Sequence, residues 1–118
     1  MIDRPRISLI RLMLAFSEAA DHIHSLVSRH QIRVAQPAAT LAWQMGLSRG
    51  KVVDIIHAGA MHDIALLRLD DKRAAREDCL PHPHEHAELG YELLKGIPHF
   101  AAAARQIRHH HVPWEHGR

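Results

Sequence analysis

Histidine is the residue type in this chain with the greatest capacity for chemistry. It supplies 13 of the 118 residues, and a neutral imidazole is the commonest side-chain ligand for metals in proteins. Five histidines lie on or beside four different predicted helices, and helix bundles build metal sites from side chains on facing helices. With one acidic residue, the candidate ligands are His30, His62, Asp63, His86, His110 and His111. A mixed imidazole and carboxylate set favours Fe, Mn, Zn or Ni over Ca or Mg, and so many ligands would suggest two or more metal ions.

The adjacent pair His62-Asp63 is the strongest local signal. It follows the small apolar run 58–61, so both polar side chains are expected to be at least partly buried. A buried charge normally requires an ionic partner or a metal. We therefore predict that this pair belongs to a metal site.

Helices must position these residues, because apolar side chains recur at helical spacing along almost the whole chain. No alternating stretch or Asn-Gly turn indicates a β-hairpin, so we predict an all-α fold, a bundle of about five to six helices. The expected helices span 5–27, 31–45, 49–63, 84–95 and 98–111, and 70–80 could form a further charged helix.

Helix boundaries follow from a few residues with known preferences. Gly46 ends the second helix, and Ser48 is a favourable N-cap for the third. On the second helix, one apolar face is expected to contain Val34, Ala38, Leu41 and Met45.

The composition excludes several classes of protein. Lys+Arg 15 against Asp+Glu 13 gives a formal charge of only +2, which is too little for a protein dedicated to binding nucleic-acid duplexes. No apolar run approaches the roughly 20 residues that cross a bilayer, so we expect a cytoplasmic protein that does not act in membranes. The single cysteine, Cys79, excludes both an internal disulfide and a Cys-rich zinc site.

Four segments resemble, in order, the HD superfamily of metal-dependent phosphohydrolases. HQIRVA at 30–35 resembles the segment of the first ligand histidine, and AGAMHDIALL at 58–67 resembles the HD motif. HAELGYELL at 86–94 and HHVPW at 110–114 are similar to segments of the HD-GYP subgroup.

The resemblance implies roles for particular residues. His30, His62, Asp63, His86, His110 and His111 would be metal ligands. Asp63 would bridge two divalent ions (Fe, Mn or Zn), and His62 and Asp63 would be the catalytic pair. Glu18 and Asp21 lie where some members supply a further carboxylate. The implied reaction is hydrolysis of cyclic di-GMP by water activated between the metals, with a histidine protonating the leaving oxygen.

The chain also departs from the HD-GYP pattern. Ala65-Leu66 replaces the usual Gly-Lys, so the lysine implied to hold substrate phosphate is missing, and Val112 replaces a glutamate. The subgroup's Gly-Tyr-Pro segment and last ligand aspartate have no counterpart. We interpret residues 1–118 as the N-terminal part of an HD/HD-GYP-like domain, incomplete at the C-terminus, and expect little or no catalysis from it alone.

Two other functions remain open at this point. One is a degenerate HD-GYP-like signalling module that binds metal or nucleotide without turnover, and the other is a different HD-superfamily activity such as a nucleotidase. The expected partner is a cyclic dinucleotide or other nucleotide. A homodimer and a fusion to a sensor domain are both compatible with the sequence.

Overall fold

The computed structural model describes residues 7–23, 29–65 and 83–116, and all regular structure in these ranges is helical. This confirms the all-α prediction. The main helices are α1 (Leu9–Ile23), α2 (His30–Gln44), α3 (Arg49–Met61), α4 (Pro83–Leu94) and α5 (Ala101–Arg108); short 3-10 helices span Pro98–Phe100 and Trp114–His116. Within these ranges, no helix is both long enough and apolar enough to cross a membrane.

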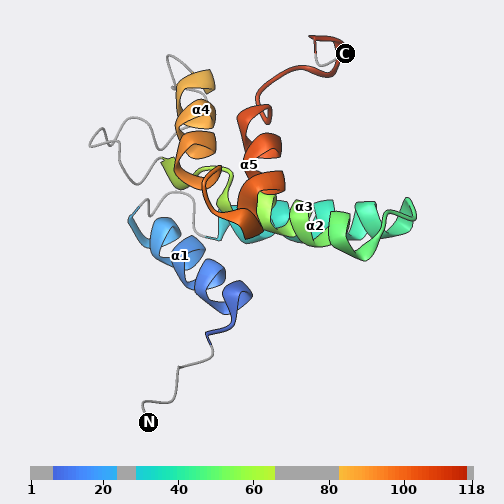
Figure 1. The fold of residues 1–118 in the computed structure, drawn as a ribbon, viewed down its shortest axis with the longest axis horizontal. Coiled ribbons are helices and arrows are strands. Elements are labelled where there is room, and N and C mark those ends of the chain that lie inside the picture. Colours follow the sequence, from blue (N-terminus) through green and yellow to red (C-terminus); the bar gives the residue numbers. More distant parts are fainter. Residues whose placement is uncertain (1–6, 24–28, 66–82, 117–118) are drawn as a thin grey trace.

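The helices form two hairpins, α2–α3 and α4–α5. In the first, a short connection follows Gln44, and Gly46 adopts a positive φ of 74° there. Ser48 then caps α3 by accepting a hydrogen bond from the Lys51 amide, as predicted. α2 packs along α3 and α4 packs along α5, while α5 and α1 both contact α3 (Figure 1). α3 is therefore the central element of the described structure.

The core is made mainly of small residues, which lets helix backbones approach closely. A Cβ added at Gly59 of α3 would lie 2.7 Å from the Cα of Ala35 on α2. Further buried alanines occur on α3 and α5, and Met13, Met61 and Ile107 fill the space between the helices. Gly59, which has no side chain, therefore sets the distance between α2 and α3.

The buried face of α2 differs from the predicted one. Gln31, Ala35 and Ala42 are buried, whereas Leu41 and Met45 are 58% and 68% exposed. α3 covers the face of α2 with Ala35 and Ala42, where only small side chains fit beside Gly59, and this leaves the predicted face exposed.

Two helix boundaries also differ from expectation. The predicted 98–111 helix starts as a 3-10 turn, and α5 ends at Arg108 because the amides of His109 and His110 bond to carbonyls three residues back. The first helix was predicted over 5–27, but α1 begins only at Leu9, because Ile7 and Ser8 are described and are not helical; the predicted end at 27 lies outside the described residues. The charged 70–80 segment also lies outside them.

His57 is a buried histidine of α3 whose ring packs edge-on against Phe100 at 5.1 Å between centroids. Burial lowers its pKa; Asp54 opposes this effect and His99 adds to it. His57 is thus held neutral within the core.

We predict that Gly59→Ala lowers the free energy of unfolding by about 1–3 kcal/mol, because its methyl group would overlap the α2 backbone. Urea denaturation measures the change. The matched control is Gly50→Ala, also on α3, where an added Cβ meets nothing within 4 Å. That control should leave stability unchanged or raise it by about 0.5–1 kcal/mol; equal behaviour of the two variants would contradict the packing argument.

We also predict a pH-dependent contribution of His57 to stability. Its pKa is lower in the folded than in the unfolded chain, so the unfolded chain takes up the proton first as pH falls through about 6.5. Stability is fully present above this pH and is lost below it, until the folded-state pKa is passed. Unfolding measured between pH 5 and 8 should show a shallower slope in His57→Leu than in the parent. His22→Gln, at an exposed histidine, should retain the parent slope; an unchanged slope in His57→Leu would disprove the prediction.

Candidate metal centre

The open ends of the two hairpins meet, and the six residues singled out in the sequence come together there. His30 is the first residue of α2, and His62 directly follows α3. His86 lies near the start of α4, while His110 and His111 follow the end of α5. These residues and Asp63 are called the His/Asp cluster below.

His30, His62 and Asp63 form one part of the cluster, the His30 group. The Nε2 atoms of His30 and His62 are 3.2 Å apart. One carboxylate oxygen of Asp63, Oδ2, lies 3.0 Å from His62 Nε2 and 3.6 Å from His30 Nε2. These three residues could hold one metal ion.

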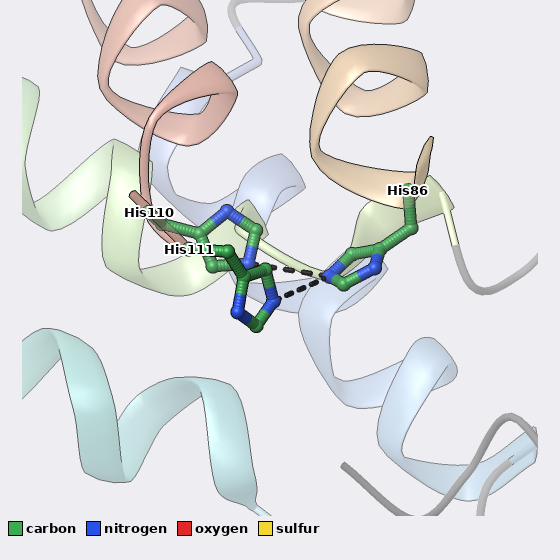
Figure 2. Close-up of side chains that lie close together, drawn as sticks. All are labelled: His86, His110 and His111. Carbon is green, nitrogen blue, oxygen red and sulfur yellow. Dashed lines mark hydrogen bonds between the residues drawn. The ribbon is translucent and has the colours of Figure 1, made fainter. Parts of the chain in front are cut away.

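His86, His110 and His111 form the other part, the His86 group. Their rings converge from α4 and from the end of α5, as Figure 2 shows. The Nε2 atom of His86 lies 3.2 Å from that of His110 and 3.0 Å from that of His111. These residues could hold a second metal ion.

Asp63 lies between the two groups. While Oδ2 faces the His30 group, Oδ1 lies 3.2 Å from His86 Nε2 and 3.7 Å from His110 Nε2. The rings of His62 and His110 also meet edge-on across the groups, at 5.3 Å between centroids. The carboxylate is therefore in position to serve both groups at once.

Backbone carbonyls at two helix ends orient two of the imidazoles. Nδ1 of His62 donates to the Gly59 carbonyl at 2.8 Å, and Nδ1 of His110 donates to the Ile107 carbonyl at 2.6 Å. The last carbonyls of a helix have no amide donor within the helix, and an imidazole N–H can act as the donor instead. Sequence reasoning missed these contacts, although a histidine placed just after a helix end is the signal that could have found them.

Burial and charge act on Asp63 in opposite directions. Burial alone would raise its pKa, but contacts with His110, His62 and His86 outweigh it and hold the pKa well below its usual range. Asp63 is therefore ionised. His30 and His110 keep about a fifth of their side-chain surface exposed (20% and 19%), which leaves the cluster open to solvent on their side.

The donor atoms fit a divalent metal. Ligand atoms held at about 2.0–2.2 Å from one ion lie about 2.8–3.6 Å from each other in tetrahedral or octahedral geometry, and the separations given above within the two groups match this range. Because Nδ1 of His62 and of His110 donates to a backbone carbonyl, Nε2 is the ring atom of each that faces the carboxylate and is available as a metal ligand.

Among the described residues, Glu18, His84 and His109 lie outside the cluster. Glu18 lines a cavity between α1 and α2, and the side chain of Asp21 falls outside what the structure describes. His84 and His109 are exposed, and Nδ1 of His109 donates to the Arg105 carbonyl instead.

Metal analysis of single variants should reveal the two groups separately. We expect the chain, purified without oxygen, to hold about two Fe, Mn or Zn ions. His30→Ala and His111→Ala should each lose about one ion, and Asp63→Asn should weaken both sites because its oxygens face both groups. Elemental analysis after gel filtration gives the ratio of metal to protein.

His109→Ala is the matched control, because this histidine neighbours His110 but lies outside the cluster. It should keep the parent's metal content. Equal losses in His109→Ala and His111→Ala, or a parent chain that takes up no metal, would show that the cluster is not a metal centre.

Comparisons with known proteins agree with this geometry. A family model described as HD domain matches residues 27–117, a range that contains the whole His/Asp cluster. No curated protein and no solved structure matches the chain. Because the family model covers more than half of the sequence, the chain belongs to the HD domain family.

Proposed function

We propose that this HD domain is a metal-dependent phosphohydrolase that cleaves phosphodiesters. The observation that carries the proposal is the position of Asp63, whose two oxygens face two separate histidine groups. A carboxylate shared by two ions is suited to hydrolysis of phosphate esters, in which both the attacking and leaving oxygens need stabilisation. His30, His62 and Asp63 would hold one ion, and His86, His110 and His111 the other.

The bound metals would supply two things, a lowered pKa for water and neutralisation of charge on the phosphoryl oxygens. The residues of the chain prepare the site for this. Asp63 stays ionised, because its histidine contacts keep its pKa low. The Gly59 and Ile107 carbonyls fix the rings of His62 and His110, so that each directs Nε2 inward. Substrate would enter on the exposed side of His30 and His110.

Cyclic di-GMP is the substrate that we propose first. Its support is the resemblance of 86–94 and 110–114 to HD-GYP segments, and both segments contribute histidines to the His86 group. Hydrolysis would proceed through the linear dinucleotide.

One observation favours a second function, a module that binds metal or nucleotide without turnover. Ala65 is completely buried, and the HD-GYP lysine expected next to it is replaced by Leu66. The chain therefore lacks, at this position, the lysine that the resemblance implies would hold substrate phosphate. Hydrolysis assays distinguish this second function from catalysis.

Hydrolysis assays on the metal-loaded chain test the proposal. We expect slow Mn- or Fe-dependent conversion of cyclic di-GMP at high protein concentration, followed by chromatography. Asp63→Asn should reduce the rate by more than the roughly 10–100-fold typical of changes around metal ligands. His109→Ala should retain the parent's rate.

The alternatives give different results in the same assays. Metal uptake with intact cyclic di-GMP would indicate the non-catalytic module. Faster turnover of nucleoside mono- or triphosphates than of the diester would indicate a nucleotidase. Hydrolysis that persists in Asp63→Asn would overturn the proposed role of the cluster.

A further inference from the structure

A cavity of about 650 Å³ lies between α1 and the start of α2, and none of the His/Asp cluster residues lines it. Leu14 and Glu18 of α1 form one wall, and Arg29, Ile32 and Arg33 form the other. Its volume falls within the range of small-molecule sites in proteins. The metal centre described above does not use it.

The two arginines give this cavity a cationic wall. Arg29 directly precedes α2 and Arg33 lies in its first turn, and both line this cavity. Both are exposed, and among the described residues no ion pair connects either guanidinium to a carboxylate. Two cations and the carboxylate of Glu18 thus line one space, and among the described residues no ion pair joins them.

The backbone at Arg29 adds an independent feature. It has a φ of 59°, the only positive value of a non-glycine residue in the described ranges. Such conformations are unfavourable for residues with a side chain and concentrate at functional sites. Here the strained residue is one of the two cations that line the cavity.

We propose that this cavity binds a phosphorylated small molecule of nucleoside monophosphate size. Guanidinium groups pair with phosphate oxygens through two parallel hydrogen bonds, which favours a phosphate between Arg29 and Arg33. Leu14 and Ile32 offer apolar surface to the body of the ligand. Glu18 on the opposite wall can accept hydrogen bonds from an amino or hydroxyl group of that body. This binding does not depend on hydrolysis at the metal centre.

Calorimetric titration of the metal-loaded chain with GMP tests the proposal. We expect measurable binding, weakened at least about tenfold by Arg33→Gln or Arg29→Gln, since each removes one charged partner of the phosphate. Arg49→Gln, at an exposed arginine of α3, should leave the affinity unchanged. Using two separate wall variants guards against a folding defect in one of them.

A fourth variant separates the cavity from the metal centre, which could itself attract phosphate. His111→Ala should leave GMP affinity at the parent value. Binding that is lost in His111→Ala but retained in both wall variants would overturn the proposal, as would the absence of binding. Glu18→Gln should weaken the binding of GMP but not that of inorganic phosphate. An equal effect on both ligands would show that Glu18 does not contact the body of the ligand.

Discussion

The buried carboxylate of Asp63 is the constraint on which the arrangement of this domain depends. A charge in the protein interior must be compensated, and here the compensation comes from both sides. Oδ2 faces histidines of the α2–α3 hairpin, whereas Oδ1 faces histidines of the α4–α5 hairpin. The same group therefore ties the open ends of the two hairpins together and sets the charge of the space between them. A cation bound in that space would therefore stabilise the fold as well.

Close helix packing provides the geometry that this electrostatic contact needs. α3 contacts α1, α2 and α5, and its small residues allow α2 to approach until only glycine fits at position 59. Gly59 also contributes the carbonyl that orients His62. One position thus fixes the spacing of the helix that begins with His30 and the direction of the ring that meets it. Gly59 is therefore needed both for the close packing of α2 on α3 and for the orientation of the His62 ring.

The sequence was sufficient for the fold class, the existence of the main helices and the identity of the residues that gather at the cluster. Helical periodicity, the Ser48 cap and the glycines that end helices can each be recognised from a few neighbouring residues, so these features could be predicted. The buried face of α2 could not be read in this way, because Leu41 and Met45 have the apolar character of core residues. Their exposure depends on which face of α2 packs against α3, which is a tertiary property. The end of α5 was also missed, since nothing local distinguishes His109 from a helical residue.

Every residue of the His/Asp cluster lies at the open ends of the two hairpins, so the hairpins can change in length at their other ends without disturbing the cluster. The connection between α2 and α3 and that between α4 and α5 lie at the opposite ends of their hairpins. Relatives could add or remove a helical turn at those distal tips, in matched pairs, without moving any donor atom. Changes in helix length would therefore alter the distal tips of the hairpins, while the end that carries the cluster keeps its geometry.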